Sequence, residues 1–309
     1  MEGEGVRMNS TQPFEQAARL LPFSLRSSVL MIPPERKDAA EEIRLRVGHP
    51  VSVTMPDGEM VLPGSLLVTS KDLHAVLEIA TKSSVHTVLD HIKNGFITVR
   101  GGHRLGLCGS AVCREGAIHN IRWISSLNIR IAKQITGIGD RVLQQMYVKG
   151  KVPSVLILAP PGAGKTTILR ELICGLSYGT GGTPFRVGVV DERGELGAMW
   201  NGIPQFDLGP HTDILDGCSK ADGLIILLRG MNPQVLAVDE ITAPEDIDAL
   251  LLAAGCGVSL LATAHGNSVE DLRMRPLYEM LFRQKIFQRV LLIRVFNGVR
   301  EYQMEEIQC

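Results

Sequence analysis

The chain has 309 residues, of which 45% are hydrophobic and 21% charged, a composition that is ordinary for a folded protein and excludes a disordered one. Its length is sufficient for two domains. The 32 Lys and Arg residues are balanced by 33 Asp and Glu residues, and aromatic residues make up only 5%. Proteins whose main ligand is nucleic acid usually combine a basic surface with stacking aromatic side chains, so we expect no nucleic-acid partner.

The first 35 residues predict an N-terminal extension without long elements. This segment is polar and contains four prolines, which interrupt helices and strands. They are Pro13, Pro22, Pro33 and Pro34. Glu2 and Glu4 precede no apolar segment, so we expect no secretory signal and a cytoplasmic protein.

Residues 36–134 predict a small α+β domain. Apolar and polar residues alternate over residues 41–54, which is typical of strands with one buried face. Helical spacing follows over residues 66–82, and two further β-rich stretches occupy residues 96–112 and 118–133.

Residues 135–309 predict an α/β domain with a parallel sheet, because short apolar runs alternate with helical segments. The runs occupy residues 154–158, 186–190, 234–238, 258–262 and 290–295. The most apolar window, residues 249–264, is shorter than a membrane span and predicts a buried helix followed by a buried strand.

A phosphate-binding loop follows the first of these runs. The P-loop pattern is G-x-x-x-x-G-K-[ST] between a strand and a helix, and here alanine replaces the first glycine. The candidate ATP-binding residues are Ala159, Pro160, Pro161, Gly162, Ala163, Gly164, Lys165, Thr166 and Thr167. We call residues 159–167 the P-loop. The alternative is a glycine-rich turn that merely opens a helix; the strand expected before the loop and the helix expected after it favour the P-loop.

Each residue type in the P-loop has a chemical reason. Gly162 and Gly164 allow backbone conformations that are closed to other residues, so that amide N–H groups converge on phosphate oxygens at a helix N-terminus. Lys165 adds a positive charge for the β- and γ-phosphates, and the Thr166 hydroxyl is placed to bind Mg²⁺. Ala159 restricts the backbone more than glycine, so the turn is expected to differ slightly.

An apolar strand ending in two carboxylates supports the same assignment. Residues 235–238 are followed by Asp239 and Glu240. In P-loop enzymes the aspartate holds the Mg²⁺ shell, and a glutamate directly after it can orient or deprotonate the attacking water. Alone, the pair could also be a surface acidic pair at the end of a strand, but after a P-loop it predicts hydrolysis.

Two further strand ends supply weaker candidates. Residues 191–195 carry three acids and an arginine, and we select Glu192 and Arg193 as catalytic candidates because α/β ligands bind at such ends. His265 follows another apolar run and could contact the γ-phosphate. The alternatives are a solvated loop and a structural histidine.

Hydrolysis also requires positive charge at the departing phosphate. Arg193 is available within the domain. Arg100, Arg104 and Arg130, in the first domain, are candidates to act in trans on a neighbouring subunit, although exposed arginines are more often plain surface.

The order of these motifs resembles the secretion ATPases, the motors of type II and type IV secretion and of type IV pili. Within that superfamily the chain is most similar to the sporulation branch found in endospore-forming bacteria. The similarity covers roughly residues 40–302. Its signatures are Gly101-Gly102-His103-Arg104, residues 126–130, Ile168-Leu169-Arg170-Glu171, residues 191–196 and residues 207–213.

The resemblance implies a RecA-like ATPase core with a smaller N-terminal α+β domain, ATP and Mg²⁺ as ligands, and a hexameric ring. It also implies peripheral attachment to membrane proteins of the same sporulation operon, on the mother-cell side of the forespore envelope. By the same resemblance Glu240 is the Walker B glutamate, Glu192 the acidic-box glutamate and His265 the histidine of the histidine box. Two alternatives stay open, a nucleic-acid translocase and a nucleotide-gated scaffold without turnover.

Overall fold

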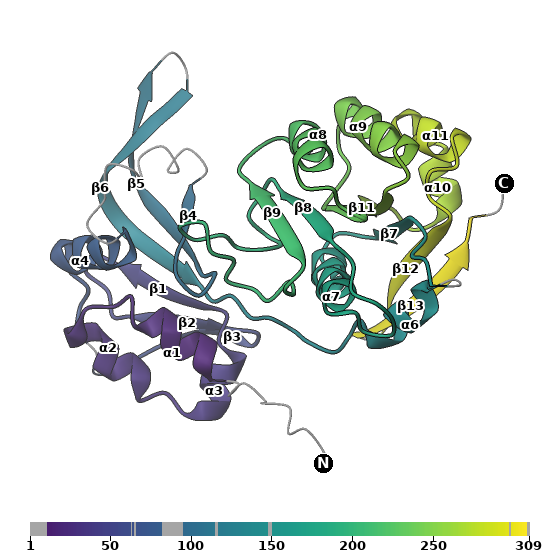
Figure 1. Cartoon of the computed structure of the whole chain (residues 1–309). Helices are drawn as coiled ribbons and strands as arrows, with labels where there is room; N and C mark the ends of the chain where they lie inside the picture. The colour runs from purple at the N-terminus through teal and green to yellow at the C-terminus, as the bar shows by residue number, and fades with distance from the viewer. Residues whose placement is uncertain are drawn as a thin grey trace. The chain divides into compact units, whose positions relative to one another are not determined.

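A computed structural model defines the fold (Figure 1). It describes residues 11–62, 64, 66–81, 95–114, 117–147, 150–296 and 298–307. Glu2, Glu4 and Lys82, the last residue of the expected helix, lie outside these residues. The chain forms two compact units. Unit 1 comprises Met1–Lys133 and Ala198–Gln205, and unit 2 comprises Gln134–Gly197 and Phe206–Cys309.

Unit 1 is an antiparallel sheet with short helices. Among its described residues the strand order is β3-β2-β1-β6-β5-β4. The strands are β1 (Glu42–Arg46), β2 (Ser52–Met55), β3 (Gly58–Val61), β4 (Phe96–Thr98), β5 (Arg104–Arg114) and β6 (Ala117–Arg130). The helices are α1 (Gln12–Ala18), α2 (Phe23–Leu30), α3 (Pro34–Ala39) and α4 (Ser70–Thr81). Buried residues of the sheet, of α1, α2 and of α4 form one hydrophobic core.

The N-terminal segment differs from the expected extension. Phe14 and Leu25, from α1 and α2, are 1% exposed and belong to the same core as the sheet residues of unit 1. The elements are short, as the prolines predict, and prolines begin them: Pro22 is the N-cap of α2 and Pro34 lies in the first turn of α3. Proline is well tolerated there because the first helical amides have no partner within the helix.

Unit 2 contains a mostly parallel sheet in the order β13-β12-β7-β11-β10-β8-β9. The strands are β7 (Val155–Ala159), β8 (Val187–Asp191), β9 (Thr212–Asp216), β10 (Val235–Val238), β11 (Ser259–His265), β12 (Arg289–Phe296) and β13 (Val299–Glu306). Among the described strands of this sheet, only β13 pairs antiparallel, with β12. The helices are α6 (Asp140–Met146), α7 (Lys165–Tyr178), α8 (Lys220–Gly230), α9 (Pro244–Gly255), α10 (Val269–Arg273) and α11 (Pro276–Arg283).

The apolar runs are buried on both faces of this sheet. Within β7, Ile157 belongs to the core beneath α6 and α7, whereas Leu156 and Leu158 belong to the core beneath α8, α9 and α11. A parallel sheet covered on both sides requires such continuously apolar strands. The five expected runs are β7, β8, β10, β11 and β12, while β9 and β13 were not anticipated.

The apolar window at residues 249–264 forms the end of α9 and most of β11, which confirms the predicted helix followed by a strand. Within the part of the chain that the structure describes, no helix is both long and apolar enough to cross a membrane.

Candidate functional site

The predicted motifs of unit 2 meet at one edge of its sheet. The parallel strands β8, β10, β11 and β7 are neighbours in that order. Ala159 at the end of β7 pairs with His265 at the end of β11, and Val238 at the end of β10 pairs with Ala262 and Val190. The residues after these strands therefore come together at the carboxyl edge, where α/β proteins bind their ligands.

The P-loop joins β7 to α7. Gly162 has φ of 74° and Gly164 has φ of 102°, both in the left-handed region that favours glycine. Gly164 is the N-cap of α7 and provides no side chain to accept the first helical amides. An anion can take that place, so the loop fits a phosphate group. Ala159 lies in extended strand backbone, which does not require glycine.

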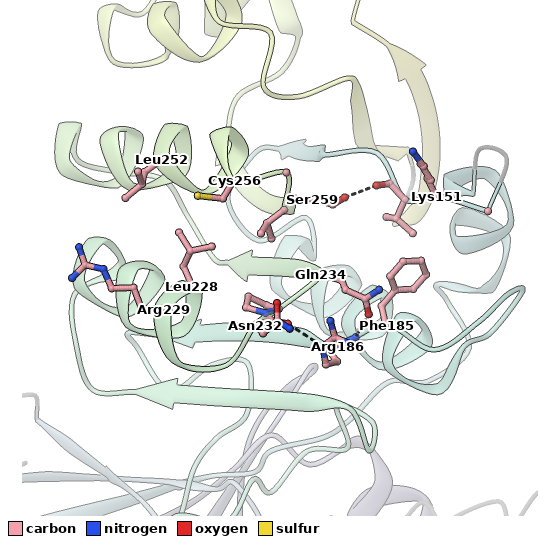
Figure 2. A pocket seen from close by; sticks show the side chains of 15 residues that line it. Lys151, Phe185, Arg186, Leu228, Arg229, Asn232, Gln234, Leu252, Cys256 and Ser259 are labelled. Carbon is pink, nitrogen blue, oxygen red and sulfur yellow. Dashed lines mark hydrogen bonds between the residues drawn. The ribbon is translucent and has the colours of Figure 1, made fainter.

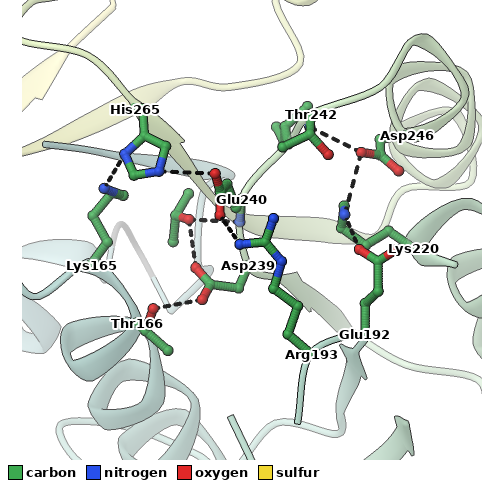
Figure 3. Close-up of polar contacts among 12 residues, drawn as sticks. Lys165, Thr166, Glu192, Arg193, Lys220, Asp239, Glu240, Thr242, Asp246 and His265 are labelled. Atoms are coloured by element: carbon green, nitrogen blue, oxygen red, sulfur yellow. Dashed lines mark hydrogen bonds and ion pairs between the residues drawn. The ribbon is translucent and has the colours of Figure 1, made fainter. Parts of the chain in front are cut away.

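Lys165 is held inside the P-loop. Its side-chain Nζ donates to the carbonyl oxygens of Ala159 at 3.0 Å and Pro160 at 3.1 Å, and lies 2.6 Å from Nδ1 of His265 (Figure 3). Burial lowers the pKa of Lys165, and the charges of Asp239 and Glu240 act in the opposite direction. Because an ammonium group only donates, His265 accepts through Nδ1 and carries its proton on Nε2.

Asp239 connects two threonines. Its Oδ2 accepts from the Thr166 hydroxyl and its Oδ1 from the Thr263 hydroxyl, each at 2.6 Å. The Thr263 oxygen also accepts from the backbone N–H of Glu240 at 2.8 Å. Hydroxyl and carboxylate oxygens are the ligands that Mg²⁺ prefers. Among the described residues no group of three or more His, Cys, Asp or Glu side chains could hold a metal ion.

Glu240 lies between a histidine and an arginine. Its Oε1 is 2.9 Å from Nε2 of His265, and its Oε2 is 2.5 Å from Nη1 of Arg193. Its φ of 54° is unusual for a residue with a side chain. The geometry thus brings together six of the predicted residues, namely Lys165, Thr166, Arg193, Asp239, Glu240 and His265.

Glu192 belongs to a second network. It pairs with Lys220, whose side chain is only 5% exposed and lies 3.7 Å from Asp246. Asp246 accepts from the backbone amides of Thr242 and Ala243, both at 3.1 Å, just after Glu240. Figure 3 shows this network beside the Glu240 cluster. The sequence reasoning missed Lys220 and Asp246, since neither lies at a strand end.

Asp191 organises the loop that carries Glu192 and Arg193. It is 2% exposed and accepts from the amides of Glu195 at 2.8 Å, Leu196 at 3.0 Å and Gly197 at 2.8 Å. Burial raises the pKa of Asp191, whereas these amides favour its charged form.

The remaining arginines divide between the units. Arg100, Arg104 and Arg130 belong to unit 1, where Arg104 lies over the ring of Phe96 at 4.6 Å. Their action in trans stays a prediction. In unit 2, Arg300 of β13 reaches the P-loop carbonyl of Ala163, a contact that the sequence did not indicate.

A hollow of about 790 Å³ lies at the opposite edge of the same sheet, where the parallel strands begin (Figure 2). Lys151, Arg186 and Arg229 contribute its positive charges. It is therefore separate from the P-loop and takes no part in the site at the carboxyl edge.

Comparison with known proteins identifies the family. The family model of "Sporulation stage III, protein AA" matches residues 12–303. The chain is 39% identical over 277 residues to Stage III sporulation protein AA of Bacillus subtilis (strain 168), covering 89% of each chain. This chain belongs to the sporulation stage III protein AA family.

Solved structures relate the family member described here to the RecA-like P-loop fold. The pilus retraction motor PilT, determined with bound ADP, aligns with a TM-score of 0.62 and 19% identity over 89% of this chain and 82% of that one. The ATPase DotB of Legionella pneumophila aligns with a TM-score of 0.59 and 16% identity over 98% and 82% of the two chains. The fold is therefore that of secretion ATPases, as the sequence predicted.

Proposed function

We propose that this member of the family binds ATP with Mg²⁺ and hydrolyses it as the motor of a secretion-type complex in sporulation. One observation carries the proposal: the P-loop residues Lys165 and Thr166 are linked by side-chain contacts to Asp239, Glu240 and His265 at one sheet edge. Family membership supports the sporulation setting.

The residues divide the chemistry as follows. The P-loop amides and Lys165 bind the phosphates, and Thr166 with Asp239 would hold Mg²⁺, which neutralises phosphate charge when bound. Glu240 accepts the proton of the attacking water. Arg193 is close enough to Glu240 to bring positive charge to the departing phosphate.

His265 connects the two halves of this site. With its proton on Nε2 it accepts from Lys165 and donates to Glu240. Phosphate groups would compete for the Lys165 ammonium, so their arrival would alter the hydrogen bonding of His265 and through it of Glu240. Glu192 contacts Lys220, which in turn lies near Asp246. In this scheme Glu192 therefore positions the residues that follow Glu240 and does not act on the water itself.

The cellular role extends this proposal. We propose a hexameric ring, attached to membrane proteins of the same operon on the mother-cell side of the forespore envelope. Sedimentation with a non-hydrolysable ATP analogue should then show a species near six subunits. A monomer at all nucleotide and protein concentrations, with the membrane partners present, would reject the ring.

Steady-state ATPase activity of the purified chain, with and without candidate membrane partners, tests the function directly. A Lys165→Ala variant should bind ATP far more weakly, and unchanged affinity would reject the P-loop assignment. Stimulation by single-stranded DNA would instead favour a translocase, and tight ATP binding without turnover under every condition would favour a nucleotide-gated scaffold.

A further inference from the structure

The hairpin formed by β12 and β13 extends past the strand that leads into the P-loop. The pairing of β12 with β7 ends at Leu292 and Leu158, but β12 continues to Phe296. Arg300 of β13 pairs with Val295, three positions beyond that last pair. At about 3.3 Å per residue this places Arg300 roughly 10 Å past the end of the β7 pairing, at the level of the P-loop.

The side chain of Arg300 contacts the backbone of the P-loop. Its Nε donates to the carbonyl oxygen of Ala163 at 3.0 Å. A Cβ atom built on Gly164 would lie 3.2 Å from the same nitrogen, so the guanidinium rests directly against this glycine. Gly164 also has φ of 102°, and any side chain there would be strained as well as crowded.

The contact fixes the direction of one P-loop amide. In a planar trans peptide the C=O and the following N–H point in opposite directions. A hydrogen bond that holds the Ala163 carbonyl toward Arg300 therefore turns the N–H of Gly164 away from Arg300. P-loops bind phosphate through backbone N–H groups, and the Arg300 contact sets the direction of this one.

We propose that Arg300 is a positioning residue that pre-organises the P-loop for phosphate by anchoring the peptide between Ala163 and Gly164. The inference rests on the proposed function. It assigns the β12–β13 hairpin a part in nucleotide binding, and the hydrogen bond from Nε is the essential feature. Direct contact of the guanidinium with phosphate is the competing explanation.

Two substitutions separate these explanations. In Arg300→Gln the side-chain nitrogen occupies the same place along the side chain as Nε, so the donor is kept and the charge is lost. In Arg300→Met a methyl group occupies that place, so donor and charge are both lost. Arg294→Met is the matched control, because Arg294 is an exposed residue of the same hairpin, paired across it with Glu301.

Binding of fluorescent ADP and ATP analogues, together with KM and kcat, provides the measurement. We expect Arg300→Met to weaken the binding of both nucleotides about five- to tenfold, which is the effect of losing one hydrogen bond. KM should rise while kcat at saturation stays within about twofold, because the loop still reaches its bound form. Arg300→Gln and Arg294→Met should stay near wild type.

Wild-type affinity in Arg300→Met would overturn the inference and leave the proposed function intact. Equal losses in Arg300→Gln and Arg300→Met would also overturn it, since charge and not the donor would then matter. If the wild-type chain bound neither nucleotide, the proposed function would fail and this inference with it.

Discussion

Replacing Glu240 by glutamine separates chemistry from stability. The substitution preserves shape and removes the carboxylate that would accept a proton. Two contacts of the carboxylate are affected: the ion pair with Arg193, whose side chain is 57% exposed, and the hydrogen bond from His265, whose side chain is 38% exposed. Pairs this accessible to solvent contribute about 0–1 kcal/mol, and the amide oxygen can still accept from Arg193. We therefore expect a loss of unfolding free energy below about 1 kcal/mol.

The expected effect on turnover is much larger. Loss of a general base lowers rates by about 10²–10⁴-fold, which corresponds to roughly 3–5 kcal/mol in the activation barrier. The assay is phosphate release at saturating ATP, together with ATP affinity and thermal unfolding of the same preparations. Glu240→Gln should bind ATP at near wild-type affinity and unfold within a few degrees of wild type.

Two results would refute this reasoning. Wild-type turnover in Glu240→Gln would mean that another group activates water. A turnover loss accompanied by a comparable loss of unfolding free energy would mean that Glu240 maintains structure. Glu245→Gln is a suitable control, because Glu245 is an exposed acidic residue in the first turn of α9.

Three predictions concern stability. Lys220→Met leaves the buried carboxylate of Asp246 without its cation, and urea unfolding should show a loss of about 3 kcal/mol. His103 is fully buried, and burial lowers its pKa from 6.5 to about 4. As the pH falls, the unfolded chain therefore takes up this proton before the folded chain does, and the free energy of unfolding should decrease by up to about 3 kcal/mol between pH 6.5 and pH 4. Urea unfolding at several pH values measures this decrease. Gly209→Ala should lower the unfolding free energy by about 1–3 kcal/mol in the same urea experiment, because its φ is +85° and a Cβ there would lie 2.5 Å from the Cβ of Ser177.

Each of these predictions has a matched comparison. Lys220→Met combined with Asp246→Asn should recover part of the loss, and no recovery would argue against a charge effect. His103→Gln should remove the part of the pH dependence that His103 contributes, so an unaltered profile would contradict that assignment. Gly230→Ala should be neutral or mildly stabilising, because Gly230 is helical with nothing within 4 Å of its added Cβ.

The contacts around Glu240 could be anticipated from local sequence. The P-loop follows one apolar run. Asp239 follows the run at residues 234–238, and His265 comes shortly after the run at residues 258–262. In a parallel sheet all strand ends of one kind share an edge, so the chain need only be known to be α/β for these side chains to be placed together. The fold itself follows from the same runs, because only a doubly covered sheet buries them.

Other features depend on registers that no local pattern reveals. Arg300 reaches Ala163 because β12 continues beyond its last pair with β7, and because the register of β13 on β12 places Arg300 opposite Val295. Lys220 is the first residue of α8, a position where a lysine is usually exposed to solvent. It is buried beside Asp246 because α8 packs against α9. The packing of the N-terminal helices into the core of unit 1 was not foreseen, because the same prolines that keep these helices short also begin them.

The path of the chain between the two units affects the choice of boundaries for any shortened form of this protein. The loop held by Asp191 ends at Gly197, and the next residues, Ala198–Gln205, belong to unit 1 before the chain re-enters unit 2 at Phe206. A fragment beginning at Gln134 would carry this segment without its neighbours, among them the backbone N–H of Gly101 that donates to Gln205. The segment continues directly from the loop bearing Glu192 and Arg193, so the chain itself joins that loop to unit 1. Any activity measured on an isolated fragment of unit 2 should therefore be compared with that of the whole chain.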